Sequence, residues 1–402
     1  MADAGGDLDL EGFRAEARAW LDANFPASLK AKGAAAMAAL MDGPEPDGDL
    51  AAWKKAMGEK GWGTPTWPKK YGGGGLSQAE ARVLQEEMNR IGARNPIQGM
   101  GPGMFGHTLL EYGTEAQKLR HLIPISRGEL RWCQGYSEPG AGSDLASLQT
   151  KCEDKGDHWE VNGQKIWTSG AQYADWCFCL VRTDPKAKKH EGISFVLINM
   201  HQPGVETRPI KLIAGSSPFC ETFFTAARVE KDDMVGPLNG GWTVGKRLLQ
   251  HERSGQGNMR GAVAVSLSDI AKKYVGVDER GRLADSDLRS RLAAHMINAK
   301  AHALTLQRAV AEARGNLNPS ATTSVMKNSG TWVGQERAEL TLEIMGTQGL
   351  GWDGDDFTKD ERTAVRSWLS GKATTIFGGS QEIQSNIVSK RILGLPDTTQ
   401  SS

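Results

Sequence analysis

The spacing of the apolar residues changes twice along this chain, and that change limits the possible folds more than any other feature. Up to about residue 131 apolar side chains recur at steps of three and four, as at Phe13, Ala17 and Leu21, which indicates amphipathic helices. From residue 132 to about 235 they alternate or form short runs, which indicates strands. After Gly240 and Gly241 the helical spacing returns. The sequence therefore predicts a helical, a β and a second helical segment.

The length of the chain makes these three segments candidate domains, because 402 residues exceed what one hydrophobic core usually holds. We expect an α+β multidomain fold with an N-terminal all-α domain (residues 1–131), a β-barrel-like middle domain (132–236) and a C-terminal domain of the four-helix-bundle type (237–402). The expected strands include residues 175–181, 192–198, 205–210 and 223–229. The expected C-terminal helices cover residues 242–270, 288–314, 322–344, 360–374 and 380–392. The Ala-rich residues 31–39 are expected to form a loop or a short helix.

Asn162-Gly163 lies between two short alternating segments, residues 158–161 and 164–167. Because Asn-Gly is a strong signal for a two-residue turn, we expect a β-hairpin here. The hairpin would end in Trp167-Thr168-Ser169, an aromatic plane followed by two hydroxyls. Such a set suits a flat heterocycle with a polar edge.

Residues 136–144, Tyr-Ser-Glu-Pro-Gly-Ala-Gly-Ser-Asp, form a segment with little side-chain bulk. Gly140 and Gly142 allow a ligand to approach the main chain closely, and the hydroxyls of Ser137 and Ser143 can donate or accept hydrogen bonds. The alternative is an ordinary turn, since Pro-Gly is a common turn dipeptide. The segment is thus a candidate contact for a flat polar ligand.

Composition narrows the classes of function. The 48 basic residues balance the 48 acidic ones, so no electrostatic feature indicates nucleic acid or an anionic membrane surface. The first residues lack a secretory signal, and no run of about 18 apolar residues occurs; we expect a soluble cytoplasmic protein without a membrane span. The five cysteines lack metal-site spacing, so we expect reduced packing residues, with Cys177 and Cys179 on one face of a strand, and no metal. The glycines at 72–75 are expected to form a turn, since no Lys-Ser or Lys-Thr follows them as in a phosphate loop.

These segments together resemble the acyl-CoA dehydrogenase family of flavoproteins. The resemblance runs nearly end to end, through Trp67-Pro68-Lys69-Lys70-Tyr71-Gly72-Gly73, residues 136–144 and 167–170, Arg228-Val229, His251-Glu252-Arg253, and Ile376-Phe377-Gly378-Gly379-Ser380-Gln381-Glu382-Ile383-Gln384. It implies the same helical, β, helical architecture, with FAD and an acyl-CoA thioester between the β domain and the bundle. It further implies a tetramer and an electron-transferring flavoprotein as electron acceptor.

Desaturating an acyl thioester requires a base for the α-hydrogen, a hydride acceptor and a polarised carbonyl. In the family FAD accepts the hydride and a glutamate is the base. Many members carry that glutamate in a Tyr-Glu-Gly-Thr loop near the C-terminus, but the matching residue here is Gly378. A minority branch, including isovaleryl-CoA dehydrogenase, places it on the first long helix of the bundle, just before an arginine. Glu252, followed by Arg253, matches that placement.

The helical pattern supports Glu252 as the base independently of the resemblance. Val244, Leu248 and Glu252 share one helix face, and the apolar stripe continues to Ile270. A carboxylate on an apolar stripe is costly unless it is paired or functional, and burial would raise its pKa towards the value that suits a base. The alternative is a structural ion pair; the absence of a glutamate at 378 favours catalysis.

The resemblance implies further residue roles. The Gly378 N–H would help to hold the thioester carbonyl, and its missing side chain would leave room for a bulky or branched acyl group. Ser380 is expected to cap a helix whose first amides suit a pyrophosphate. The implied FAD contacts are Gln134, Tyr136, Ser137, Gly142, Ser143, Trp167, Thr168, Ser169, Ser380, Gln381 and Glu382. The implied substrate contacts are Ser143, Arg253 and Gly379.

Two departures from the family pattern concern assembly. The Arg-x-x-Phe-Gly motif that reaches the FAD of a neighbouring subunit is replaced here by residues 278–284, Asp-Glu-Arg-Gly-Arg-Leu-Ala. The glutamine often used on the adenine side is Glu343. The leading hypothesis is therefore an FAD-dependent acyl-CoA dehydrogenase in a homo- or hetero-tetramer. Its rivals are an incomplete subunit of a heterotetramer, and a flavin oxidase or monooxygenase on the same fold.

Overall fold

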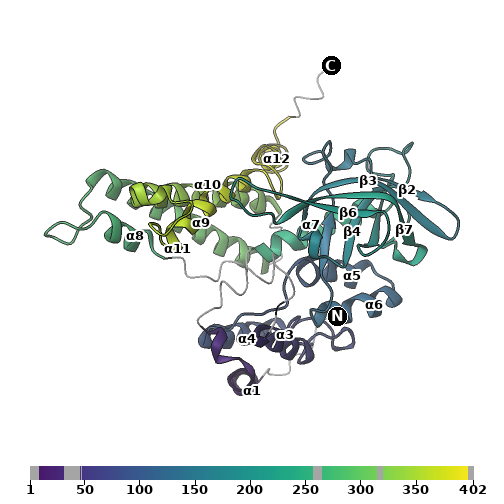
Figure 1. The fold of residues 1–402 in the computed structure, drawn as a ribbon, viewed down its shortest axis with the longest axis horizontal. Coiled ribbons are helices and arrows are strands. Elements are labelled where there is room, and N and C mark those ends of the chain that lie inside the picture. The colour runs from purple at the N-terminus through teal and green to yellow at the C-terminus, as the bar shows by residue number, and fades with distance from the viewer. Residues whose placement is uncertain (1–8, 31–45, 47, 257–264, 315–319, 397–402) are drawn as a thin grey trace. The chain divides into compact units, whose positions relative to one another are not determined.

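The computed structural model describes residues 9–30, 46, 48–256, 265–314 and 320–396 (Figure 1). These residues form two compact units. The first contains the described residues of 1–210 and 217–262, and the second contains those of 211–216 and 263–402. The predicted order of helical, β and helical segments is confirmed. The boundaries at 131 and 236 stay a prediction, and residues 31–39 lie outside the described residues.

The N-terminal helices begin and end where local chemistry allows. Ser77 caps α4 and exchanges hydrogen bonds with Glu80, and Thr114 caps α6 in the same way with Gln117; such capping boxes satisfy amides that have no partner inside the helix. Their apolar faces bury a cluster that includes Trp53. The helices are α1 (Leu10–Asn24), α3 (Gly48–Glu59), α4 (Gln78–Ile91), α5 (Gly106–Tyr112) and α6 (Glu115–Ser126).

Within the described residues, seven strands form one curled sheet that follows the N-terminal helices in sequence. Its order is β1-β4-β2-β3-β7-β6, with β5 paired to β4. The β1–β4 and β2–β4 pairs are parallel and the others are antiparallel. The strands are β1 (Trp132–Gly135), β2 (Lys151–Asp154), β3 (His158–Ser169), β4 (Trp176–Arg182), β5 (Ile193–Asn199), β6 (Val205–Ile210) and β7 (Phe219–Glu230).

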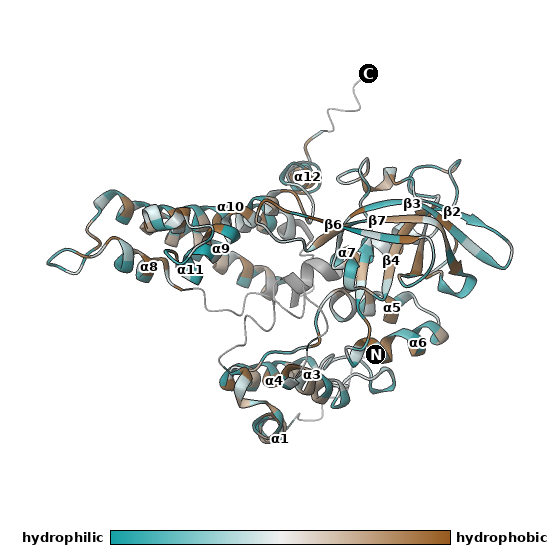
Figure 2. Cartoon of the chain, in the orientation of Figure 1, coloured by the Kyte–Doolittle hydropathy of each residue, from teal (hydrophilic) through white to brown (hydrophobic). Residues whose placement is uncertain are grey.

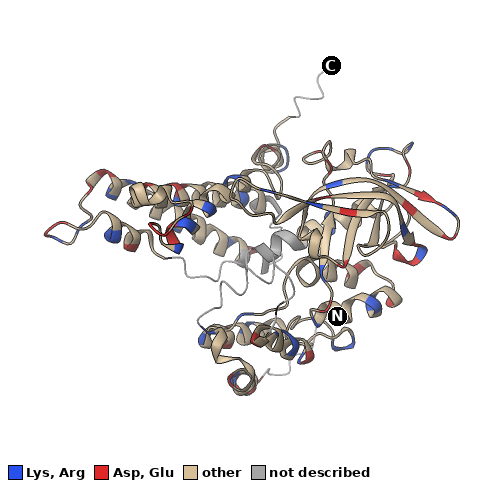
Figure 3. Cartoon of the chain, in the orientation of Figure 1, with Lys and Arg blue, Asp and Glu red and all other residues tan. Residues whose placement is uncertain are grey.

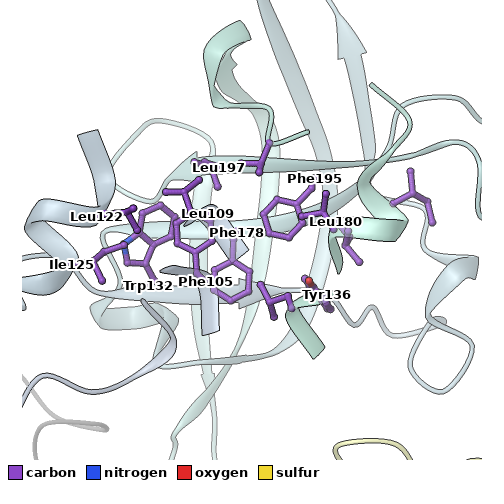
Figure 4. Packing of buried hydrophobic residues seen from close by; sticks show 14 of the residues in the cluster. Phe105, Leu109, Leu122, Ile125, Trp132, Tyr136, Phe178, Leu180, Phe195 and Leu197 are labelled. Carbon is purple, nitrogen blue, oxygen red and sulfur yellow. The ribbon is translucent and has the colours of Figure 1, made fainter. Parts of the chain in front are cut away.

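Strand β4 is buried on both faces, because its side chains alternate between two cores. Phe178 and Leu180 join a cluster that also contains Phe105 of the N-terminal helical segment (Figure 4). Cys177 and Cys179 face a second cluster inside the sheet. The five cysteines are free thiols and all are buried, as expected for packing residues. Figure 2 shows β4 in brown and white, whereas the loops around the sheet carry more teal.

The hairpin predicted at Asn162-Gly163 is wrong, because β3 runs without a turn from 158 to 169. The dipeptide instead sits at a bulge where the register with β7 shifts. A Cβ on Gly163 would lie 2.7 Å from the Cα of Thr150, and the Asn162 side chain accepts a hydrogen bond from Ala226 N. Close backbone approach, not a tight turn, therefore requires this glycine.

Helix α7 (Gly241–Gln256) packs on the sheet through Val244 and Leu248, which belong to the same core as Phe178 (Figure 1). The prediction of one helix from 242 to 270 is wrong, since Ser266 is not helical and caps a separate helix, α8 (Leu267–Tyr274). The expected stripe from Val244 to Ile270 therefore does not lie on one helix. Helices α7 and α8 also belong to different units.

The second unit is helical, and α10 contacts most of its other elements. The helices expected at 288–314 and 322–344 are confirmed. The helix expected at 360–374 ends at 371 and continues as a 3-10 turn, and the one expected at 380–392 ends at 387 before a wider turn. The remaining helices of the unit are α9 (Ser286–Arg314), α10 (Ser320–Met345), α11 (Lys359–Gly371) and α12 (Gln381–Ile387).

The other sequence expectations concern local features. The glycines at 72–75 form a tight turn: a Cβ on Gly73 would lie 2.3 Å from the carbonyl oxygen of Trp67. Figure 3 shows acidic and basic residues interspersed over the elements. None of the described helices combines the length and apolar character that crossing a bilayer requires. The described part of the chain groups no three His, Cys, Asp or Glu side chains as a metal ion would need.

Candidate functional site

The structure brings together the two loops that the sequence singled out. The Ile166 N–H donates to the Ser137 carbonyl oxygen at 2.8 Å, and the Lys165 ammonium donates to the Tyr136 carbonyl oxygen at 3.0 Å. Residues 136–144 therefore lie beside the end of β3, where Trp167-Thr168-Ser169 stands. The sequence predicted this juxtaposition only through the resemblance.

A buried ion pair holds the glycine-containing loop from inside. Lys165 is fully buried, and its ammonium lies 2.8 Å from the carboxylate of Glu138, which is 9% exposed. The same carboxylate accepts backbone N–H bonds from Gln149 at 2.6 Å and Thr150 at 2.9 Å. Burial alone would raise the pKa of Glu138, but the Lys165 ammonium and these donors hold that pKa below its usual value. Glu138 therefore stays ionised and ties the loop to β3 and to the residues at 149 and 150.

Arg182 secures the far end of the same loop. Its buried guanidinium donates to the Ala146 carbonyl oxygen at 2.7 Å and to the Leu148 carbonyl oxygen at 3.2 Å. The other terminal nitrogen donates to the Lys189 carbonyl oxygen at 2.9 Å. A planar fork with five donors suits such scattered carbonyl acceptors. The loop and the residues that follow it are thus preorganised by two basic side chains, of which Lys165 is fully and Arg182 almost fully buried.

Trp167 is held outward by an uncommon backbone conformation. It has φ +61° at a register shift in β3, and 52% of the residue is exposed. A bulky residue with positive φ is an outlier that persists only where its surroundings enforce it. The Phe219 ring meets the Trp167 ring edge to face at 6.0 Å. An indole is thereby presented beside the loop of residues 136–144.

The other predicted cofactor contacts in the β domain differ in how far their side chains are exposed to solvent. Gly142 and Ser143 are exposed, and Ser137 and Ser169 are partly exposed. Thr168 is buried, and its hydroxyl donates to the Cys220 carbonyl oxygen at 2.8 Å, so that hydroxyl faces the sheet. The Tyr136 side chain also points inward, with its hydroxyl 3.4 Å from the Gly245 carbonyl oxygen.

Gln134 carries a buried polar atom that the described residues leave without a partner. Its Nε2 is buried and has no hydrogen-bond partner among the described residues. A buried donor left unpaired costs about 1–3 kcal/mol, so such a group indicates a missing acceptor. Gln134 lies directly before the loop, on β1. The set therefore offers a bare backbone, an indole face and an unpaired donor.

The predicted site residues of the second unit, 378–382, lie together at the start of α12. Gly378 and Gly379 have φ +67° and +88°, and the Ser380 hydroxyl accepts from Ile383 N at 3.3 Å, which confirms it as the cap of α12. The Gln384 side chain donates to the Gly378 carbonyl oxygen at 3.1 Å. Gln381 and Glu382 are exposed in the first turn of α12.

At the proposed base the structure describes the backbone but not the side chains. Glu252 and Arg253 lie on the backbone of α7, but their side chains lie outside the described residues. Their roles stay predictions, as does the approach of Gly378 to the loops of the first unit.

Sequence reasoning missed Lys165 and Gln384. Lys165 lies on β3 and is fully buried like Val161, and a lysine at an inward position was the available signal; the predicted turn at 162–163 hid it. Gln384 gave no signal, because its partner is a carbonyl group and not a side chain.

The comparisons with known proteins cover all three segments. Family models match as the N-terminal domain (residues 9–129), the middle domain (133–227) and the C-terminal domain (239–393) of acyl-CoA dehydrogenase. The acyl-CoA dehydrogenase IpdE1 of Mycobacterium tuberculosis is 36% identical, covering 96% of this chain and 98% of that protein. The glutaryl-CoA dehydrogenase of Desulfococcus multivorans is 30% identical over 73% of this chain and 78% of that protein.

Solved structures give the same result. One described as the Tcur3481-Tcur3483 steroid ACAD superposes with a TM-score of 0.78 and 30% identity, covering 99% of this chain and 100% of that one. The ChsE4-ChsE5 complex from Mycobacterium tuberculosis gives a TM-score of 0.73 and 28% identity, covering 99% and 100%. With its three domains matched in order, the chain belongs to the acyl-CoA dehydrogenase family of flavoprotein oxidoreductases.

Proposed function

We propose that this chain binds FAD and converts an acyl-CoA thioester into a trans-2-enoyl-CoA, with the electrons passing to an electron-transferring flavoprotein. The observation that carries the proposal is the hydrogen-bonded junction between Ser137 and Ile166, which sets the bare loop beside the outward Trp167. Family membership supports the reaction class.

The residues at this junction fit a flavin. An isoalloxazine is flat, with an aromatic face and a polar edge, and needs a stacking surface with donors around it. Trp167 would supply the surface, and Ser137, Ser169 and the unpaired Nε2 of Gln134 would supply polar groups. Gly142 and Ser143 would let the loop approach a phosphate, and residues 380–382 are proposed for the pyrophosphate. When bound, FAD supplies the hydride acceptor that no amino acid provides.

The proton chemistry is assigned to Glu252. The carboxylate would abstract the α-hydrogen, while the N–H of Gly378 would hydrogen-bond the thioester oxygen as charge develops on it. Gly378 has no side chain, so it cannot be the base. Among the described residues, apart from its chain neighbours, no heavy atom lies within 4 Å of the position of a Cβ, so Gly378 leaves space. Ser143, Arg253 and Gly379 are proposed contacts for the thioester.

The space at Gly378 supports a bulky or ring-bearing acyl group. A similar solved structure is described as a steroid ACAD. We therefore expect polycyclic thioesters to be better substrates than straight-chain ones. A panel of CoA thioesters assayed with an artificial electron acceptor tests this, and equal efficiency for straight-chain and ring-bearing thioesters would contradict it.

An assembly of two different chains is the second candidate, and Glu343 favours it. Where relatives often have the adenine-side glutamine, Glu343 pairs with Arg291 at 2.6 Å. Apolar side chains also stand exposed on the long helices, Ile297 on α9 and Trp332 on α10 (70% and 51% exposed), as expected of an interface. Two similar structures are described as pairs of chains. FAD retained at one per chain by the purified protein alone would exclude a need for a different partner.

The decisive experiment is anaerobic reduction of the bound flavin by acyl-CoA. We expect bleaching of the flavin absorbance with the native chain and none with Glu252→Gln. The matched control is Glu111→Gln, because Glu111 pairs with Arg247 of the same helix at 2.7 Å. Bleaching that survives Glu252→Gln at the native rate would refute Glu252 as the base. Rapid oxygen consumption without an external acceptor would instead identify an oxidase.

A further inference from the structure

The peptide that joins Gly378 to Gly379 is held by a side chain with no assigned role. Gln384 is 2% exposed, and its Nε2 donates to the Gly378 carbonyl oxygen at 3.1 Å. Gln384 lies in the first turn of α12, so it reaches back over the start of its own helix. The contact therefore closes a short ring between the helix and the glycines.

Both glycines are required by this arrangement. Their φ values of +67° and +88° lie in the region that residues with a Cβ rarely adopt. A Cβ on Gly379 would also lie 2.4 Å from the Nε2 of Gln384. The side chain of Gln384 thus occupies the space that a Cβ at position 379 would fill. Gln384 can take this position only because residue 379 is a glycine.

The ring is anchored to α10, the helix that contacts most other elements of the unit. The Asn328 amide of α10 donates to the Gln381 carbonyl oxygen at 3.4 Å and to the Ser385 hydroxyl at 3.3 Å. On the other side, Gln335 of α10 donates to the Gly371 carbonyl oxygen at 3.2 Å. The segment from 371 to 385 is therefore fixed to α10 before and after the glycines, and Gln384 fixes the glycines themselves.

Orienting a carbonyl group also orients the amide next to it. In a trans peptide the C=O and N–H groups point in opposite directions, and no cis peptide occurs in the described chain. With the Gly378 carbonyl directed at Gln384, the Gly379 N–H points away from it. In the described part of the chain, neither glycine N–H is among the backbone donors that have a backbone acceptor. Gly378 is exposed and Gly379 partly exposed, so both donors can bind water or a ligand.

We propose that Gln384 is a positioning residue, which aims the N–H donor of Gly379 at the thioester oxygen, beside the N–H of Gly378. This inference rests on the proposed function, because it adds an oriented second donor beside the one already assigned to Gly378. Donors fixed before the reaction stabilise developing negative charge without reorganising. Without Gln384, two adjacent glycines would rotate among several conformations, and the ground-state thioester would lose less than the transition state.

The first test replaces Gln384 by Met, which keeps the length of the side chain and removes the donor. We expect kcat to fall by about 10- to 100-fold with KM within about threefold. This is less than the roughly 100- to 1000-fold known for losing an oxyanion donor outright, because the N–H stays and only its orientation is lost. Exchange of the substrate α-hydrogen with deuterated water, which needs no electron acceptor, should slow by a similar factor. Asn386→Met is the control, since Asn386 is exposed on the same helix, and it should leave both rates unchanged.

The second test uses pH. In Gln384→Glu a protonated carboxyl can donate to the Gly378 carbonyl oxygen, whereas an ionised one repels it. We expect an added ionisation in the kcat profile of this variant, with activity recovered towards low pH; a merely structural role would not produce it. Should the Met variant fail to fold, this profile carries the test.

The outcomes separate the two proposals. A native enzyme that neither bleaches with any thioester nor exchanges the α-hydrogen overturns the proposed function, and this inference with it. A native enzyme that does both, combined with Gln384→Met at native kcat and a Gln384→Glu profile without a new ionisation, overturns the role of Gln384 alone.

Discussion

The buried pair of Glu138 and Lys165 gives the sharpest energetic prediction. In Glu138→Gln the shape is kept, but the ammonium of Lys165, which is fully buried, loses its counter-charge. Removing one partner of a buried pair costs about 3–5 kcal/mol. The amide can also accept from only some of the donors that the carboxylate served, Gln149 N, Thr150 N and Lys165 Nζ, and an unpaired N–H costs about 1–3 kcal/mol. Because these losses share atoms and do not add, we expect about 3–5 kcal/mol in all.

The assay must be local, since a chain of two compact units need not unfold in one step. Native-state hydrogen exchange reports the opening free energy at each amide. The amides of Gln149 and Thr150 should lose that amount of protection. Adding Lys165→Met should restore part of it, because the stranded charge is then gone.

A surface pair in the same domain provides the control. Glu153 lies 3.1 Å from Lys155, with the two side chains 55% and 38% exposed, and such pairs contribute about 0–1 kcal/mol. Glu153→Gln should therefore change protection by less than 1 kcal/mol. The reasoning is refuted if Glu138→Gln behaves like this control and Lys165→Met gives no rescue.

Three further substitutions test other features of the fold. Burial, and then the neighbouring Arg120, lower the pKa of His121 to about 3. As the pH falls, the imidazole is therefore protonated in the unfolded chain before it is protonated in the folded one. The free energy of unfolding should fall by up to about 4 kcal/mol between pH 6.5 and pH 3. Urea midpoints of His121→Gln should be flatter over that range, and an unchanged slope contradicts the assignment. Gly163→Ala would force a Cβ against the Thr150 backbone and should cost at least about 1–3 kcal/mol by thermal melting, whereas Gly103→Ala, with nothing within 4 Å, should be near neutral. Gly379→Ala should lower stability by about 1–3 kcal/mol through its positive φ; equal melting of this variant and the native chain would show that the strain is relieved elsewhere.

The sequence was informative where structure depends on neighbours along the chain. The period of the apolar residues located β6 at 205–210 and the helix α10, and the cap at Ser380 was readable from its residue type. It failed where a distant partner decides. Asn162-Gly163 has a strong local turn preference, but β7 and the approach of Thr150 hold the strand straight.

The candidate site shows the same division. The loop and the Trp167 motif were visible as residue types, and the resemblance joined them. Three contacts of the site join residues that lie 27 or more positions apart: the hydrogen bond from Ile166 to Ser137, the Glu138–Lys165 pair, and the hydrogen bond from the Thr168 hydroxyl to Cys220. Only the fold brings these residues together. No periodicity encodes such pairings.

The double burial of β4 has a consequence for how the first unit comes apart. Phe178 on this strand shares one cluster with Phe105 and Leu109 of the N-terminal helices and with Leu248 of α7. Removing any of these elements would expose an apolar surface to water. The sheet and the helices that share this cluster should therefore unfold as a single cooperative unit. Limited proteolysis should accordingly release no stable fragment ending near residue 131. A chimera that takes its N-terminal helices from a relative should then fold only if the residues of β4 that contact those helices come from the same relative.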